Sequence, residues 1–514
     1  MTRYRTLVRA TLVQQSAWTG GGTQGDPSAQ DRTIARDGMG RLTMTGSSLA
    51  GALVATAARI IPLAWDKDPV WQMVSGKRSP GRENTDYRQS VWRFHASHPE
   101  DVAARMPESR DGVGVRQKTG ATALERGAKF DTEVLPQGAR WPLFLEIDTE
   151  TGGNEPLALA LRALDEWRHG RCWLGASAAR GLGRMKLENI EIVHLPLQAA
   201  YVSLWPDATI DKAELWKKLV GSGLAVVSLD QALAETAEVQ LAGEKEEPWE
   251  YLEMGFQLEA GMQADGYGWN SLSTGGGPWL TFNPPMESLM VPPGMDPEKW
   301  KYFAAAQDHP VLVTAGGRGA RRAPMIAGSS LRGTLRHAVS RLARIGGEHV
   351  DDPLAVATDQ KPAPSDPAAA VFGWLDQDTA LLVGDASSKS APTPQLALLM
   401  MHAEDEFAAG VHASSLHNRT CVMSGAFEFS MVLEAPNEAV LREHLARLLP
   451  GIQAAASGQV PVGGAAWRGH GWIPWKPVFI RRATAGKGCW TEVETGTAPV
   501  DKLRNMALAN GGQG

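Results

Sequence analysis

Hydrophobic and polar positions follow two patterns along this chain, and the order of the patterns repeats. Residues 6–18 (TLVRATLVQQSAW) and 251–261 (YLEMGFQLEAG) are rich in apolar and β-branched side chains with a near two-residue period, which predicts β-strands. Residues 47–60 and 329–345 place their apolar side chains at helical spacing, which predicts amphipathic helices. Each half of the chain therefore begins with a strand that leads to a helix.

The same two signals return later in each half. Residues 156–170 and 437–458 predict a second amphipathic helix, and residues 185–195 and 472–480 predict a closing strand. Strand, helix, strands, helix and strand is the order of a ferredoxin-like βαββαβ unit, whose sheet offers one face to the helices and leaves the other free to bind. The sequence thus predicts an α+β protein of two tandem ferredoxin-like (RRM-like) domains with thumb-like and loop insertions.

The domain limits follow from these elements. We expect a first domain at 1–210, a helical or charged linker at 211–245, a second domain at 246–482 and a flexible tail at 483–514. Three polar or Gly/Pro-rich stretches do not fit a minimal unit and are expected insertions: 77–136, 269–285 and 351–424.

Two short motifs recur in the same order, which indicates an internal duplication. G-S-S-L begins at Gly46 and again at Gly328, 282 positions later, each time at the start of a predicted helix. An R-G-x-G pattern follows downstream in each half, at 180–183 and at 468–471.

A G-S-S-L helix start exposes backbone amides and hydroxyls where the helix dipole is positive, which favours phosphate binding. Ser47 and Ser329 are expected to cap their helices, whereas Ser48 and Ser330 could reach a phosphate. Simple N-capping is the alternative interpretation. The glycines of R-G-x-G permit close approach of a ligand backbone, and the alternative there is a tight turn before a strand.

Net charge alone does not indicate a nucleic-acid binder, because the formal charge is −6. However, residues 315–345 hold seven arginines and no acid, so one region is locally basic. The three cysteines show no C-x-x-C spacing and fit a reducing cytoplasm. No apolar run is long enough to cross a membrane, so we expect a cytoplasmic protein without membrane contact.

Two aspartates precede the G-S-S-L motifs. Asp31 lies 15 positions before Gly46, and Asp308 lies 20 positions before Gly328. A carboxylate beside a phosphate site suggests a metal-binding or proton-handling role. Solvated loop acids are the alternative, and Asp26 and Asp37 are further candidates in the first half.

The aspartate loop, the G-S-S-L helix and the late R-G-x-G loop together resemble the RAMP superfamily. The pattern is most similar to the repeated backbone subunit of type III CRISPR complexes, here as a fusion of two such subunits. Residues 110–135 resemble that family's thumb-like insertion. Residues 90–97 and 381–388 lie where the family has a short strand ending in Asp-Ala or similar. Ala50 departs from the family's usual lysine, and the second half lacks a clear thumb motif.

The resemblance implies a metal-dependent endoribonuclease that holds a CRISPR guide RNA and cuts complementary target RNA beside other effector subunits. Asp31 and Asp308 match the catalytic aspartates, with a divalent metal, expected to be Mg²⁺, at the same residues. The attacking group would be a neighbouring ribose 2′-OH, so that RNA but not DNA is cut. The implied RNA-binding residues are Gly46, Ser47, Ser48, Arg180, Gly181, Gly183, Gly328, Ser329, Ser330, Arg332, Arg336, Arg468, Gly469 and Gly471.

Three other functions compete with this one. A non-cleaving backbone subunit would bind RNA without using the aspartates. A repeat-processing RAMP endoribonuclease would rely on histidine-centred chemistry, and no His/Tyr/Lys cluster lies near the N-terminal loops. A protein-interaction module would need no RNA at all, and the paired basic, glycine-rich loops argue against it.

Overall fold

The structure is a computed structural model. It describes residues 3–22, 31–61, 69–76, 89–100, 107–116, 129–149, 154–196, 212–241, 247–262, 269–270, 289–291, 294–299, 323–351, 366–374, 378–388, 394–402, 417–495 and 499–508.

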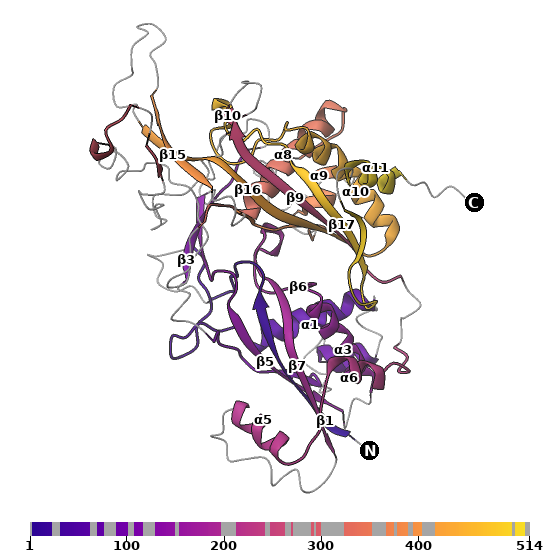
Figure 1. The fold of residues 1–514 in the computed structure, drawn as a ribbon. Coiled ribbons are helices and arrows are strands. Elements are labelled where there is room, and N and C mark those ends of the chain that lie inside the picture. Colours follow the sequence, from indigo (N-terminus) through magenta and orange to yellow (C-terminus); the bar gives the residue numbers. More distant parts are fainter. Residues whose placement is uncertain are drawn as a thin grey trace, which may run out of the picture.

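The first half of the chain builds a sheet around its first strand (Figure 1). Its strands are β1 (Arg3–Gln14), β2 (Trp92–Phe94), β5 (Arg140–Asp148), β6 (Cys172–Trp173), β7 (Arg184–Pro196) and β8 (Val226–Val227). Its helices are α1 (Gly46–Ile60), α2 (Pro69–Ser75), α3 (Glu155–Arg168), α5 (Lys212–Gly221) and α6 (Leu229–Glu235). The order is β2-β5-β1-β7-β6, with β8 beside β7. Strands β3 (Glu108–Val113) and β4 (Lys129–Val134) form a separate antiparallel pair.

The second half builds a larger sheet in the same way. Its strands are β9 (Glu250–Met262), β10 (Trp269–Asn270), β11 (Leu289–Met290), β12 (Met325–Ile326), β13 (Leu381–Val383), β14 (Ala386–Ser388), β15 (Gln395–Met401), β16 (His417–Ala435), β17 (Lys476–Thr484) and β18 (Thr491–Thr495). Its helices are α8 (Gly328–Ile345), α9 (Pro367–Phe372), α10 (Glu438–Ala456) and α11 (Pro499–Leu508). The order is β11-β15-β16-β9-β17-β18, with β13 and β14 beside β16.

The two halves repeat one arrangement. The elements β1, α1, β2, β5, α3 and β7 of the first half correspond in order to β9, α8, β13, β16, α10 and β17 of the second. In each sheet the first strand lies between the third and the fourth, and these pairings are antiparallel. The mixture of helices with antiparallel sheets confirms the α+β class, and we interpret the shared order as ferredoxin-like.

Helices α1 and α3 pack on one face of the first sheet. Val8 and Leu12 of β1 point to that face and are fully buried against it. Leu7, at a neighbouring position, points to the opposite face and packs with Trp216 of α5, because successive strand residues alternate between faces. Helix α5 therefore covers part of the face that the sequence predicted to be free.

The second sheet has no free face where it meets the first half. Met254, Phe256 and Leu258 of β9 pack toward α8 and α10. Tyr251, on the opposite face, belongs to the core of the first half, and Glu253 is buried there beside Arg184. The expectation that each sheet leaves one face open is therefore wrong for the second half, because that face forms the junction between the halves.

The prediction of a flexible tail at 483–514 is wrong for most of its described residues. Strand β18 pairs with β17, and α11 packs on α10. Leu503 of α11 is fully buried in the second core. Apolar residues in this short segment complete the second core. The glycine content of the segment, on which the prediction rested, carries no information about this packing.

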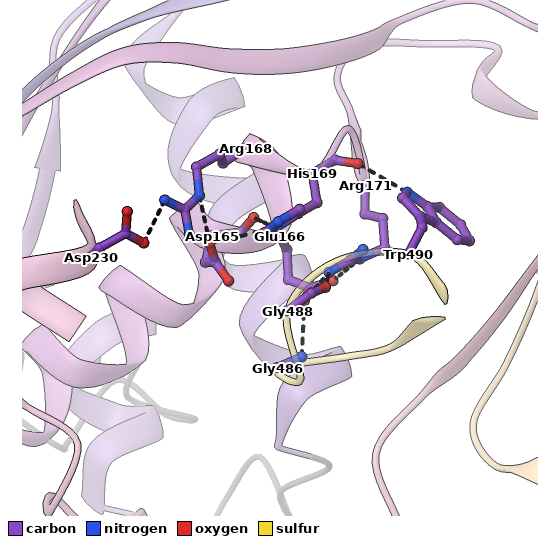
Figure 2. A network of polar contacts seen from close by, with 9 residues as sticks. All are labelled: Asp165, Glu166, Arg168, His169, Arg171, Asp230, Gly486, Gly488 and Trp490. Atoms are coloured by element: carbon purple, nitrogen blue, oxygen red, sulfur yellow. Dashed lines mark hydrogen bonds and ion pairs between the residues drawn. The ribbon is translucent and has the colours of Figure 1, made fainter. Parts of the chain in front are cut away.

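The loop between β17 and β18 fastens the second half to the first, as Figure 2 shows. Arg171 and Glu166 are both buried and form a two-pronged ion pair at 2.5 and 2.8 Å. The Arg171 guanidinium also donates to the carbonyl oxygen of Gly488, and the Gly486 amide donates to Glu166 at 2.9 Å. The indole N–H of Trp490 donates to the carbonyl of His169 at 3.0 Å.

Candidate nucleic-acid interface

The aspartate loop of the first half lies alongside β4. Its backbone pairs with this strand through the amide of Arg32, which donates to the carbonyl of Asp131 at 3.2 Å. The Asp131 amide donates in turn to Asp31 Oδ2 at 3.1 Å. Buried Ile34 anchors the loop, and its amide donates to the Glu133 carboxylate at 2.7 Å. The Asp31 carboxylate is thereby held in an exposed position at the side of the β3–β4 pair.

Asp37 was a further candidate for the catalytic aspartate, but its carboxylate is used in local hydrogen bonds. Its carboxylate accepts hydrogen bonds from the amides of Met39 and Arg41, both at 2.9 Å, and from the Arg41 side chain at 2.8 Å. The Arg41 amide is the main reason that the pKa of Asp37 is lowered. Asp37 therefore closes a turn. Asp26 and Asp308 lie outside the described residues.

Ser47 and Ser329 do not cap their helices as predicted. Thr45 is the N-cap of α1, and its hydroxyl accepts from the Ser48 amide at 3.2 Å. The side chains of Ser47 and Ser48 lie within 3.0 and 2.8 Å of the Thr45 hydroxyl and are exposed. Gly46 is required because a Cβ there would lie 2.4 Å from the carbonyl oxygen of Phe94.

In the second half a carboxylate takes the place that we expected for a phosphate. The Gly328 amide, at the start of α8, donates to Asp385 Oδ1 at 2.8 Å. Asp385 also pairs with Arg110 of β3 at 2.9 Å. Ala327 is the N-cap and provides no side-chain hydrogen bond, so Ser329 does not cap. An internal acid already satisfies this helix end.

Arg332 is directed partly into the protein. Its guanidinium donates to the carbonyl of Phe372 and to Thr379 Oγ1, the latter at 3.2 Å. Burial, together with nearby Arg336 and Arg180, lowers the pKa of Arg332 to about 10. Arg336 lies 5.8 Å from the ring centre of Trp374.

Both glycine motifs form the same turn. A non-glycine residue in the left-handed region precedes a short 3₁₀ helix in each case: Ser177 (φ 62°) before η2 (Ala178–Arg180) and Ala465 (φ 58°) before η4 (Ala466–Arg468). The second glycine of each motif has no space for a side chain, since a Cβ on Gly183 or Gly471 would lie 2.0 or 1.9 Å from a backbone carbonyl oxygen. The tight-turn interpretation therefore describes this local geometry, and phosphate contact remains a prediction.

The two turns differ in their surroundings. A Cβ on Gly181 would lie 2.6 Å from the carbonyl oxygen of Val383, so the first turn is docked on the second half. A Cβ on Gly469 would meet no atom of the described chain within 4 Å. The first turn is therefore used inside the chain, and the second is open.

Docking of the first turn brings together arginines from distant parts of the sequence. Arg180 and Arg32 lie 5.1 and 5.9 Å from the ring centre of Phe130 on β4. Desolvation and the charge of Arg32 lower the pKa of Arg180. Arg180 in turn contributes to the lowered pKa of Arg332. We call Arg32, Arg180, Arg332 and Arg336 the arginine cluster.

The sequence predicted separate sites in the two halves, but the cluster combines the first turn with the second G-S-S-L helix. Arg32 and Phe130 were missed as site residues. Their signals were adjacency to Asp31 and a place in the thumb-like segment.

The second turn holds a buried Cys–His pair rather than an activated nucleophile. The Cys421 sulfur lies 4.0 Å from His470 Nδ1, and both residues are buried. Burial raises the pKa of Cys421 to about 12, so its thiol stays protonated at neutral pH. Arg468 is half-buried in this turn.

The described side chains form no metal-binding cluster of their own. No group of three or more His, Cys, Asp or Glu residues there could hold a metal ion. Mg²⁺, however, is commonly bound by one or two carboxylates plus substrate phosphate and water. Exposed Asp31 fits such a role with an RNA phosphate present, whereas a resident metal centre does not fit the described residues.

Gly181 and Gly469 offer a matched test of the docked turn. Their φ angles are 89° and 88°, so alanine carries the same backbone penalty of about 1–2 kcal/mol at either position. Gly181→Ala should destabilise the protein by about 1–2 kcal/mol more, because its Cβ also meets Val383. Thermal or urea unfolding measures the difference. Equal losses would contradict a docked first turn.

Comparison with known proteins bears on the same region. Residues 13–186 match the family model described as the RAMP superfamily, which covers the aspartate loop, α1, the β3–β4 pair and the first glycine turn. No curated protein matches the chain. Among the helices that the structure describes, none has the length and apolar character needed to cross a bilayer. The match implies a CRISPR-associated RNA-binding protein. Residues 13–186, about a third of this chain, are thus similar to the RAMP superfamily.

Proposed function

We propose that the chain is a backbone subunit of a type III CRISPR interference complex that binds guide RNA and cleaves complementary target RNA. One observation carries the proposal: β4 holds the exposed Asp31 carboxylate and the Phe130 ring, on which Arg32 and Arg180 converge. Cations that attract phosphates and a carboxylate able to take part in phosphodiester cleavage thus lie beside one strand. We propose that the protein acts in the cytoplasm.

In this proposal the guide backbone binds the first G-S-S-L helix and the arginine cluster. The exposed hydroxyls of Ser47 and Ser48 lie at an α1 start that carries no acidic side chain in its first turn. The α8 start, in contrast, is neutralised by Asp385. We therefore assign the stronger phosphate contact to α1.

The target strand is proposed to lie beside Asp31, with Asp308 in the corresponding place of the second half. A divalent metal, Mg²⁺ by preference, would bind Asp31 together with the target phosphate and neutralise its charge. The protein's own contribution is to hold this carboxylate beside β4 and to place cations on the neighbouring phosphates.

Other effector subunits are the proposed protein partners. Support comes from the difference between the glycine turns: Gly181 is covered by the Val383–Asp385 segment, whereas Gly469 is open. Such an open turn is suited to receive the corresponding segment of another subunit.

A non-cleaving backbone subunit is the second candidate. The observation in its favour is that the arginines converge on Phe130 and that Asp31 takes no part in that contact. A scaffold would need the arginine cluster but not Asp31.

Cleavage of a labelled, guide-complementary RNA by the assembled complex separates the two candidates. We expect Asp31→Ala to remove one product with a loss of at least about tenfold in its rate of formation. Asp308→Ala should remove a different product, and the double variant should remove both. EDTA should abolish cleavage, and a 2′-deoxy nucleotide at the cut position should block it.

Asp37→Asn is the matched control, because Asp37 is a loop acid of the same segment that closes a turn. It should leave both products unchanged. If the Asp31 and Asp308 variants bind RNA and give the wild-type products, the chain is a scaffold and another subunit cuts.

A further inference from the structure

A cleft lies between the two halves, and its walls are cationic and aromatic; Asp31 is not among its lining residues. Its volume is about 520 Å³, which falls within the range of small-molecule sites. The first half contributes Trp173, Arg184 and Lys186, and the second contributes Arg481 and Trp490. Arg168, at the end of α3, also lines it. Figure 2 shows this side chain beside Asp165 and Asp230.

The charges of this cleft are not balanced along its walls. Arg184 and Arg481 share a single carboxylate, that of buried Glu253, at 2.8 and 2.6 Å. Two guanidinium groups are thus held by one negative charge. Asp385, the acid of the lining, is already paired with Arg110.

Lys186 adds a further positive charge. It is exposed on β7, two residues beyond Arg184, so both side chains project from the same face of the strand. Its ammonium group makes no ion pair within the described part of the chain. An anion entering the cleft would therefore meet one free ammonium group beside two guanidinium groups that share a counter-charge.

Aromatic and amide groups accompany these cations. Trp490 packs under the Arg481 guanidinium, 4.9 Å from ring centre to Cζ, which fixes the orientation of the indole. Trp173 is half-buried on the wall of the first half. Gln15 and Gln137 also line the cleft and carry both donors and acceptors. A ligand that matches all three features has a phosphate, a flat ring and polar ring edges.

We propose that this cleft binds a nucleoside phosphate, with the phosphate at Lys186, Arg184 and Arg481 and the base against the tryptophans. The ligand is either a free nucleotide or a single nucleotide of the bound RNA. The proposal does not require Asp31 to be catalytic, and no member of the arginine cluster lines the cleft.

Binding of AMP to the full-length, RNA-free chain, measured by calorimetry, tests the proposal. Saturable binding at one site is expected. Lys186→Glu should weaken it at least about tenfold, because it replaces the free cation with an anion. Trp173→Leu should weaken it as well, whereas adenosine and inorganic phosphate should each bind more weakly than AMP. Lys217→Glu, an equal charge change on exposed α5, should leave AMP affinity unchanged.

A competition experiment between AMP and bound guide RNA identifies the source of the nucleotide. If bound guide RNA displaces AMP and a photoreactive base in that RNA crosslinks to the Trp173 segment, the occupant is a nucleotide of the RNA. If AMP binds equally to the RNA-loaded protein, the occupant is a free nucleotide. Absence of saturable AMP binding, or equal weakening by Lys186→Glu and Lys217→Glu, would overturn the proposal.

A separate variant distinguishes a failure of the nucleotide-binding proposal from a failure of the proposed RNA-guided function. Arg180→Ala should reduce RNA binding while leaving AMP binding intact, because Arg180 belongs to the arginine cluster and does not line the cleft.

Discussion

Arg171→Met is expected to lower the free energy of unfolding by about 3–5 kcal/mol. The Arg171 side chain is fully buried, and its removal leaves the Glu166 carboxylate, 1% exposed, without its counter-charge. The substitution also removes the donor to the Gly488 carbonyl and the cation beside the Trp490 ring. Because these contacts join the two halves, each half should lose the stabilisation that it receives from the other. Urea unfolding, monitored by tryptophan fluorescence, measures the loss in the free energy of unfolding.

Arg168→Met is the matched control for this prediction. Arg168 lies three residues earlier and pairs with Asp165 and Asp230, but its side chain is 30% exposed. Partly solvated pairs of this kind contribute about 0–1 kcal/mol. The double variant Glu166→Leu/Arg171→Met should recover part of the loss, because no unpaired buried charge remains. A loss for Arg171→Met no larger than that for Arg168→Met would show that the buried pair does not fasten the halves.

Local patterns predicted the main elements well because their causes are local. The strand expected at 251–261 is β9 (Glu250–Met262), and the helix expected at 329–345 is α8 (Gly328–Ile345). Apolar periodicity within such a segment requires one buried face, whatever that face packs against. The repeated glycine motifs likewise reflect a backbone requirement, the left-handed turn at Gly181 and Gly469, that is visible in the sequence.

The junction between the halves could not be predicted in this way. In the sequence Glu253 is a polar position on an alternating strand like any other, yet in the fold it is buried between Arg184 and Arg481. Asp385 was part of a short strand motif, and only the fold places it at the start of α8. Both depend on partners far away in the sequence, about which periodicity carries no information. The tail was misjudged for the same reason, since α11 is held by its contact with α10.

Motifs in the sequence named the candidate site residues, whereas their arrangement in space depends on the fold. Asp31, Ser48 and Arg180 were identified from motifs, and the structure shows their local geometry. The convergence of Arg180 with Arg332 arises because the first turn docks on the second half. An alignment of two repeats suggests two equivalent sites, whereas packing makes them inequivalent.

Glu253 should make the protein sensitive to acid between about pH 4.5 and pH 2. Burial raises the pKa of this carboxyl, but Arg184 and Arg481 outweigh burial and lower it to about 2. A depressed folded-state pKa contributes stability that is fully present above the unfolded value, near 4.5, and is lost as the pH falls toward 2. The shift corresponds to roughly 3 kcal/mol for a side chain that is 2% exposed.

Glu253→Gln should therefore lower stability by roughly 3 kcal/mol at neutral pH and flatten the stability profile across this window. Unfolding measured at a series of pH values from 6 to about 2 tests this, with the difference from wild type isolating Glu253 from other carboxyls. Glu259→Gln, six residues further along β9, is the control, because Glu259 pairs with Lys476 at the surface and both are about half exposed. Parallel profiles for wild type and Glu253→Gln would contradict the assignment. Neutralising Glu253 also releases Arg184 and Arg481 toward the cleft, so the same variant should bind AMP more tightly while it folds less stably.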